Sequence, residues 1–457
     1  MGAIPHSLRS LFIDFNAYFA SVEQQLRPEL RERPVAVTPV PHDSGCCIAA
    51  SYEAKAFGVK TGMRVGEARR LCPAIVIVPA RPRSYVTMHH RLLAAIDRCI
   101  PVGAIHSIDE VSCRLDRTER DPTRAADLAR RIKRSICENV GGCMRCSIGI
   151  APNRFLAKVA TDMQKPDGLV IIEKHELPDR LFDLEPIDLP GIGPRMSARL
   201  AGAGVTSVRQ LCAFSEMEMD HLWGGIVGRR FWSWLRGEQT AERPTVRRSL
   251  GHQHVLPPKF RTDEGARAVA LRLLHKAAAR LRHVHSAARR LTLSIRFRDD
   301  SRFAQGAPGP GWGRGSWNAV APLGPCCADT PTMLEALGRL WSARPAGVPV
   351  QVGVTLHELV APESLSPPLF DGERTRENLS RAMDTVNARF GANTVYTSTI
   401  HEVRHTGDGG IAFTYVPDLD VTDTVTDRMS SSSGDARLLE AITSAREPHE
   451  WEAWKEQ

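Results

Sequence analysis

Two adjacent acidic residues, Asp109 and Glu110, stand inside a stretch of the sequence that otherwise reads as a β-strand. The stretch is VGAIHSIDEVSCRL at 102–115, and we expect it to form one strand. Two like charges side by side in a strand are costly unless a basic side chain, water at an exposed edge or metal ions lie beside them. The fold of this chain must therefore bring such a partner to this strand.

A third acidic residue, Asp14, follows the first apolar run of the chain, LFI at 11–13. We expect this run to be a buried strand, and Asp14 can meet Asp109 and Glu110 if the two strands are neighbours in one sheet. Three converging carboxylates repel each other unless cations hold them, and oxygen-only ligands favour Mg²⁺ or Mn²⁺ over zinc. Two such ions about 4 Å apart are the common arrangement for phosphoryl transfer. We therefore expect a phosphoryl-transfer site that binds two Mg²⁺ ions, with Mn²⁺ as the alternative.

Three further side chains can bind the phosphates of a substrate. Tyr52 and Lys55 are three residues apart in a predicted helix at 49–58, so they share one helical face. Lys165 lies near the end of a second predicted helix, at 154–168. Each lysine alone reads as an ordinary solvent-exposed side chain, but together with the acidic trio they favour a triphosphate contact.

The next part of the chain changes character from mixed strands and helices to short helices with glycine turns. The segment DLPGIGPRMSARLAGAGVTSVRQL, at 188–211, resembles a helix-hairpin-helix. The turn that contains Gly191 and Gly193 can aim backbone N–H groups at a DNA phosphate. An ordinary pair of antiparallel helices is the alternative.

Positive charge is concentrated in the C-terminal half. The net charge is +8, and residues 261–300 contain ten Arg or Lys against four Asp or Glu. The segment 290–298 alternates strictly, with Leu, Ile and Phe on one face and Arg290, Arg296 and Arg298 among Ser and Thr on the other. We expect a small sheet whose apolar face is covered by a basic helix after Thr262 and a helix at 330–342. The cationic face suits a sugar-phosphate backbone, although a merely solvated face is the usual alternative.

Five segments, in this order, resemble the Y-family translesion DNA polymerases. They are LFIDFNAYFASVEQQ, SYEAKAFGVKTGM, HSIDEVS, CSIGIAPNRFLAKVATDMQKPDG and DLPGIGP, and the likeness covers about residues 8–360. The resemblance implies an α+β multidomain fold shaped as a right hand. It places the palm at 1–23 and 79–166, the fingers at 24–78, the helix-hairpin-helix thumb at 167–240, the little finger at 241–360 and a C-terminal tail at 361–457.

The same resemblance implies roles for individual residues. Asp14, Asp109 and Glu110 would be catalytic and would bind the metal ions together with Phe15. The residues implied in nucleotide binding are Phe15, Asn16, Ala17, Tyr18, Phe19, Tyr52, Lys55 and Lys165. Phe19 would be the steric gate that excludes a 2′-hydroxyl, while a core aromatic in a helix is the plain alternative. Two positions depart from the family: Asn16 replaces a common aspartate, and Lys55 replaces a common arginine and loses its bidentate geometry.

The implied function is that of a DNA-directed DNA polymerase, a nucleotidyltransferase that adds dNTPs to a primer 3′ end with low fidelity and no proofreading. Such an enzyme serves DNA damage tolerance. One alternative is a catalytically weak relative that links a sliding clamp to another polymerase, but such relatives lack the acidic trio. A nucleotidyl cyclase is the other, and it needs neither the hairpin thumb nor the basic sheet.

The expected partners are primer-template DNA, dNTPs and the sliding clamp. Leu369 and Phe370, in SPPLF at 366–370, resemble a clamp-binding peptide in which Ser366 replaces glutamine, and an ordinary surface loop is the alternative. No apolar run approaches the ~18–20 residues that span a membrane, and no signal peptide is apparent. We expect a cytoplasmic, nucleoid-associated monomer whose last residues are partly disordered.

Overall fold

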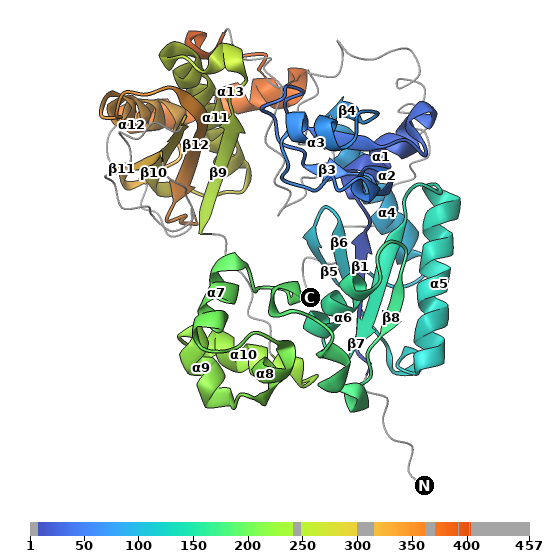
Figure 1. Cartoon of the computed structure of the whole chain (residues 1–457). Helices are drawn as coiled ribbons and strands as arrows, with labels where there is room; N and C mark the ends of the chain where they lie inside the picture. The colour runs from blue at the N-terminus through green and yellow to red at the C-terminus, as the bar shows by residue number, and fades with distance from the viewer. Residues whose placement is uncertain are drawn as a thin grey trace. The chain divides into compact units, whose positions relative to one another are not determined.

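The computed structural model of this chain describes residues 8–240, 248–298, 315–361, 371–391, 393–401 and 403. The described residues form two compact units, the first made of 8–240 and the second of those from 248 onward (Figure 1). Among the described helices, none is long and apolar enough to cross a membrane. Short 3-10 helices lie at Pro28–Leu30, Arg117–Glu119, Lys174–Glu176, Asp179–Leu181, Pro186–Asp188, Pro258–Phe260 and Ser398–Ile400.

A five-stranded sheet with the order β5-β6-β1-β7-β8 is the centre of the first unit (Figure 1). Its strands are β1 (Ser10–Phe15), β5 (Ala104–Ser107), β6 (Glu110–Arg114), β7 (Cys146–Ala151) and β8 (Leu169–Ile171). β1 pairs antiparallel with both β6 and β7. The first strand and the acidic pair are therefore neighbours, as predicted.

The prediction of a single strand at 102–115 is wrong. Ile108 and Asp109 form a turn, so that β5 and β6 are the two arms of a hairpin. Ser107 Oγ donates to Asp109 Oδ1 at 2.5 Å. Asp favours tight turns because its short side chain bonds to groups close to it in the chain. Asp109 thus stands at the tip of a hairpin, and Glu110 is the first residue of β6.

Alternation along β1 divides its side chains between two layers of helices. Leu11, Ile13 and Phe15 are buried in one cluster with residues of α1 (Tyr18–Leu26), α4 (Pro82–Asp97) and α5 (Pro122–Asn139). Phe12 packs on the other face with residues of α6 (Arg154–Met163). Asp14 is two residues from Phe12, so its side chain lies on the α6 side of the sheet.

A smaller sheet with the order β3-β2-β4 lies between α1 and α4 in the chain. Its strands are β2 (Val35–Thr38), β3 (Ala49–Ala50) and β4 (Val76–Pro79), and its helices are α2 (Tyr52–Ala56) and α3 (Val65–Leu71). The helix predicted at 49–58 is shorter than expected because Ala49 and Ala50 pair with β2. Ser51 then caps α2 by accepting the N–H of Ala54 at 3.3 Å.

Four helices complete the first unit: α7 (Pro194–Gly202), α8 (Val208–Ala213), α9 (Glu216–Trp223) and α10 (Ile226–Leu235). They pack around Leu200, Leu211 and Phe231, in the same cluster as α6. The predicted turn before α7 is present, and Gly191 adopts the left-handed φ of 92° that favours glycine.

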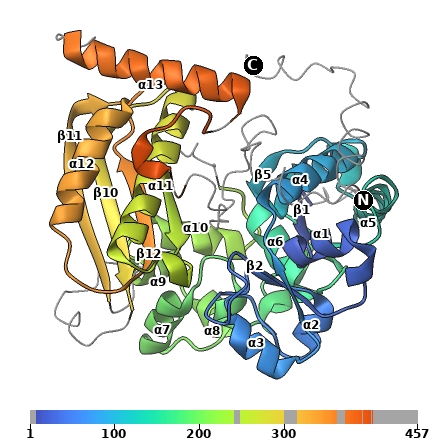
Figure 2. The same cartoon turned by 90° about the horizontal axis from the view of Figure 1, so that it is seen from above.

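The second unit is a four-stranded antiparallel sheet with the order β11-β10-β12-β9. Its strands are β9 (Ser249–Val255), β10 (Ala288–Phe297), β11 (Ser316–Cys327) and β12 (Pro349–His357). One face packs against α11 (Asp263–His283) and α12 (Thr330–Ser342), and α13 (Asp371–Phe390) packs on these two helices (Figure 2). The predicted helix cap at Thr262 is confirmed, since its hydroxyl accepts the N–H of Gly265 at 3.1 Å.

Candidate active site

Asp14 and Glu110 lie on the α6 side of the five-stranded sheet, where both pair with Lys158, and Asp109 precedes Glu110 at the hairpin tip. Asp14 of β1 stands opposite Glu110 of β6 in the strand register. The N–H of Phe15 donates to the carbonyl of Asp109 at 2.9 Å, which ties the hairpin tip to the end of β1. The fold thus brings together residues that are almost one hundred positions apart in the chain.

Two lysines supply positive charge to these carboxylates. Lys158 Nζ lies 2.6 Å from Asp14 Oδ2 and 2.9 Å from Glu110 Oε1. Lys165 Nζ lies 2.9 Å from the same Asp14 oxygen. Asp162 pairs with both ammonium groups, at 3.4 Å from Lys158 and 2.8 Å from Lys165.

Lys158 and Asp162 were missed by sequence reasoning. They are four residues apart on α6, and Lys165 follows three residues after Asp162, so their spacing was the available indication. Asn153 starts this helix, since its Oδ1 accepts the N–H of Leu156 at 2.8 Å.

The protonation of these groups follows from burial and from their neighbours. Burial raises the pKa of Asp109, and the charge of Asp14 raises it further, against the hydrogen bond from Ser107. Burial acts to lower the pKa of Lys158, but Asp14, Asp162 and Glu110 outweigh it and hold the pKa above its usual range. The Lys158 ammonium therefore stays charged and occupies a cation position between Asp14 and Glu110.

The donor set suits a hard divalent cation, because all the acidic ligands offer oxygen. Within the part of the chain that the structure describes, no three His, Cys, Asp or Glu side chains already surround one point as metal ligands. The ammonium of Lys158 between two of the carboxylates is the observation that marks a place for positive charge.

Tyr52 and Lys55 of α2 are electrostatically coupled to the same site. Lys55 Nζ lies over the Tyr52 ring, 4.3 Å from its centroid. Burial lowers the pKa of Lys55, and the charge of Lys165 lowers it further. Burial raises the pKa of Tyr52, while Lys165 acts in the opposite direction. The three predicted phosphate donors therefore interact with one another.

The side chain of Asn16 is buried and holds the loop that follows α6. Its Nδ2 donates to Ser147 Oγ at 3.1 Å, and its Oδ1 accepts the N–H of Asp167 at 2.7 Å. Asp167 in turn pairs with Lys133 at 2.9 Å. Asn16 thus fixes the loop that contains Lys165.

The segment from Ala17 to Phe19 opens α1 beside this site. Ala17 precedes the helix in the left-handed conformation, with φ of 47°, a strained geometry for a residue other than glycine. Phe19 is half-buried, and its ring centroid lies 4.6 Å from that of Tyr85 and 5.6 Å from that of Tyr18. The Tyr18 hydroxyl donates to the carbonyl of Tyr85 at 2.6 Å.

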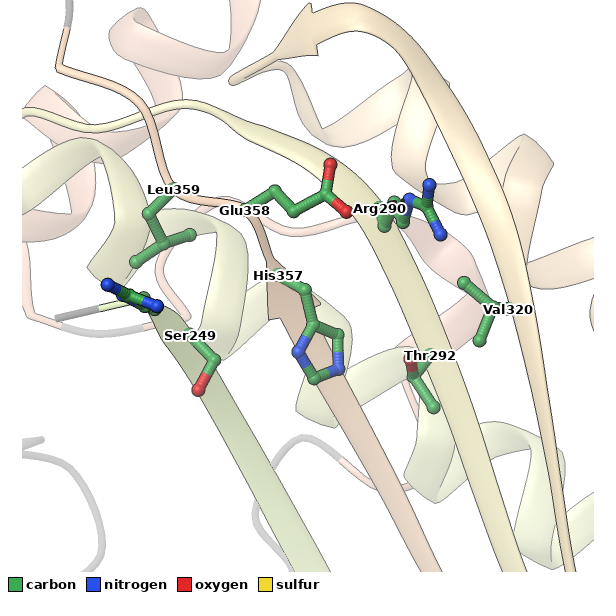
Figure 3. Close-up of a pocket in the computed structure, with 8 residues that line it drawn as sticks. Ser249, Arg290, Thr292, Val320, His357, Glu358 and Leu359 are labelled. Atoms are coloured by element: carbon green, nitrogen blue, oxygen red, sulfur yellow. Dashed lines mark ion pairs between the residues drawn. The ribbon is translucent and has the colours of Figure 1, made fainter. Parts of the chain in front are cut away.

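The residues predicted to contact DNA belong to both structural units. Gly191 and Gly193 are exposed in the turn before α7. In the second unit, Arg290 Nε pairs with Glu358 Oε1 at 2.9 Å at one end of the sheet, beside a hollow of about 660 Å³ (Figure 3). Arg296 and Arg298 are exposed toward the other end of the same sheet. Leu369 and Phe370 lie outside the described residues.

The chain matches known proteins over most of its length. A sequence profile described as the impB/mucB/samB family matches residues 13–162, and the profile of that family's C-terminal domain matches residues 247–369. The DNA polymerase IV of Moorella thermoacetica is 34% identical over 398 residues, which cover 84% of this chain and 94% of that protein. The chain belongs to the Y family of DNA polymerases. The DNA polymerase IV 1 of Bacillus subtilis is 33% identical over 303 residues, 65% of this chain and 72% of that protein.

The solved structures agree with the predicted fold of this Y-family polymerase. A Y-family polymerase chimera of Dbh and Dpo4 covers 77% of this chain and 99% of its own, with a TM-score of 0.63 and 24% identity. The α+β right-hand fold with palm, fingers, thumb and little finger is therefore confirmed. The first matched segment contains Asp14, Asp109 and Glu110, and the second contains the four-stranded sheet.

Proposed function

We propose that this Y-family polymerase copies a DNA template by adding dNTPs to a primer 3′ end and continues past damaged bases. The meeting of Asp14 and Glu110 at Lys158 and Lys165, with Asp109 bound through its carbonyl to the end of β1, carries this proposal. A scaffold function does not need an intact acidic trio, so it is not favoured. A cyclase is not favoured either, because the chain belongs to a polymerase family.

Asp14, Asp109 and Glu110, with the carbonyl of Phe15, would hold divalent cations, Mg²⁺ before Mn²⁺. When bound, such cations lower the pKa of the attacking hydroxyl and neutralise the leaving pyrophosphate. Lys158 and Lys165 compensate the same carboxylates, so lysines and metal ions share one anionic site. We infer that Lys165, with Lys55 and Tyr52, then contacts the triphosphate as a set of charged and hydrogen-bonding donors.

We also propose how the structural parts divide this work. The five-stranded sheet is the palm, the β3-β2-β4 sheet with α2 and α3 is the fingers, α7 to α10 are the thumb, and the β11-β10-β12-β9 sheet is the little finger. The exposed turn at Gly191 and Gly193 would bind a phosphate through backbone N–H groups. Residues 366–370 would bind a sliding clamp, and the protein would act as a cytoplasmic, nucleoid-associated monomer.

Primer extension tests the proposed activity directly. The full chain, a labelled primer on a template, Mg²⁺ and one dNTP at a time should give extension with the complementary nucleotide, also opposite an abasic site. A folded protein that binds primed DNA without extending it would instead favour the scaffold function.

Replacing Phe19 with alanine should relax the choice between deoxyribose and ribose. The ring would lie under the sugar, and its removal would open room for a 2′-hydroxyl, so we expect the dNTP-over-rNTP ratio of kcat/KM to fall roughly a hundredfold. Single-nucleotide insertion measures this ratio. Leu26→Ala, at the far end of α1 and packed on the same core, should leave the ratio unchanged, and an equal effect of both variants would show that Phe19 is only a core residue.

Replacing Arg296 and Arg298 with alanine should make DNA binding less sensitive to salt. Each phosphate contact contributes about 0.9 to the slope of log K against log salt, so the slope should fall by about two. Binding of primed DNA by fluorescence anisotropy from low to moderate salt gives the slope. The matched control removes two exposed arginines from the helices behind the sheet, Arg267 and Arg339. An unchanged slope for Arg296→Ala with Arg298→Ala would remove this face from the DNA interface.

A further inference from the structure

A buried histidine of α4 contacts the hairpin tip that holds Asp109. His89 is 0% exposed, and its Nδ1 lies 2.8 Å from the carbonyl oxygen of Ile108, the residue immediately before Asp109. A carbonyl oxygen only accepts hydrogen bonds, so Nδ1 carries the proton and donates. The His89 side chain thus binds the turn from the face of the sheet opposite α6.

The second nitrogen of this ring, Nε2, makes no hydrogen bond to a described residue that would offset its burial. His89 Nε2 is buried and has no hydrogen-bond partner among the described residues. Burial lowers the pKa of His89 to about 4, so the ring is neutral and Nε2 is a bare acceptor. A buried polar atom without a partner carries a desolvation penalty that an apolar side chain would avoid. What the imidazole offers in return is the hydrogen bond to Ile108.

Hydrogen bonds hold the turn at consecutive positions around the Asp109 carboxylate. His89 binds the carbonyl of Ile108, the N–H of Phe15 binds the carbonyl of Asp109, and Ser107 Oγ binds the carboxylate of Asp109. The charge of Asp14 acts on that carboxylate. Rotation of the Ile108–Asp109 peptide would move the carboxylate, and the bond from His89 opposes this rotation.

We infer that His89 is a positioning residue, which fixes the hairpin tip so that Asp109 is pre-organised to bind a divalent cation with Asp14 and Glu110. This inference rests on the proposed polymerase function. It adds a function for α4, which also places Tyr85 against Phe19 one helical turn earlier. Removing a group that orients a metal ligand commonly lowers metal affinity or activity about 10–100-fold.

Two variants of His89 that differ only in where they place an amide test the inference. His89→Asn keeps a donor near the position of Nδ1, whereas His89→Gln moves it toward the position of Nε2 and loses the bond. His89→Leu removes the donor and keeps an apolar filler. His90→Leu, next along the helix, is the matched control.

The measurement is Mn²⁺ binding to the full chain with primer-template DNA and an unreactive dNTP analogue, followed by the electron paramagnetic resonance of free Mn²⁺. We expect His89→Leu and His89→Gln to raise the Mn²⁺ concentration at half-saturation about tenfold. The same midpoint should stay within about threefold of the wild type in His89→Asn and His90→Leu. The Mg²⁺ midpoint of nucleotide insertion should shift in the same order, with kcat recovered at high Mg²⁺.

Equal midpoints for the asparagine and glutamine variants would overturn the inference, as would a loss of folded protein without any shift in midpoint. If His89→Leu does not fold, the Asn and Gln pair decides alone. A wild-type chain that binds no Mn²⁺ and extends no primer would instead refute the proposed function.

Discussion

Replacing Asp109 and Glu110 together with alanine is expected to reduce primer extension by a factor on the order of 10³ or more. The pair would supply two of the three carboxylates that hold the divalent cations, and Asp14 with the Phe15 carbonyl would not alone hold the two ions that balance the charge of a transferring phosphoryl group. Single-turnover insertion of the complementary dNTP at saturating Mg²⁺ measures the loss. Extension within tenfold of the wild type would place the chemistry elsewhere in the chain.

A folding defect can be separated from this loss of chemistry. The pKa of Asp109 is raised in the folded chain, first by burial, so its ionised form lowers stability at neutral pH, and this cost disappears as the pH falls through the folded pKa. We therefore expect Asp109→Ala alone to melt at pH 7 no lower than the wild type, and the double variant, which also loses the ion pair between Glu110 and Lys158, to keep its affinity for primed DNA. Asp162→Asn removes a carboxylate that contacts the same lysines, and it should lower insertion by about tenfold at most.

The acidic trio was predictable because its pattern is local. An acidic residue after an apolar run and two adjacent acidic residues are visible in the sequence, and alternation in β10 was equally visible. Leu291, Leu293 and Ile295 are buried as predicted, while Arg290, Arg296 and Arg298 are exposed. A period of two is reliable in a strand with one apolar and one polar face.

What escaped prediction depends on contacts across the fold. The turn at Ile108 and Asp109 contains neither glycine nor proline, and one aspartate is too weak a turn signal to divide 102–115 into two strands. Lys158 and Asp162 read as an ordinary surface pair on a helix, and only the sheet beneath α6 brings them to Asp14. The expectation that metal ions balance the carboxylates was therefore incomplete, because two lysines also do so.

Replacing Glu23 with glutamine should lower the free energy of unfolding of the first unit by about 3–5 kcal/mol. Glu23 is fully buried, and Arg81 donates to its two oxygens at 3.1 and 2.8 Å. The Tyr85 hydroxyl adds a third bond at 2.8 Å. Loss of the carboxylate charge removes the ion pair of the mostly buried Arg81 guanidinium. Because the chain has two units, hydrogen exchange of peptides from α1 and α4 measures the effect better than a single melting curve.

The control is the simultaneous change of Glu23 and Arg81 to leucine. Removal of a whole buried ion pair costs little, so this double variant should be more stable than Glu23→Gln. Asp127→Asn, which breaks an exposed pair with Arg130, should cost less than about 1 kcal/mol. If Glu23→Gln costs no more than Asp127→Asn, the buried pair does not join α1 to α4. Tyr85 links Glu23 to Phe19, so the destabilised variant should also lose part of its discrimination against ribonucleotides.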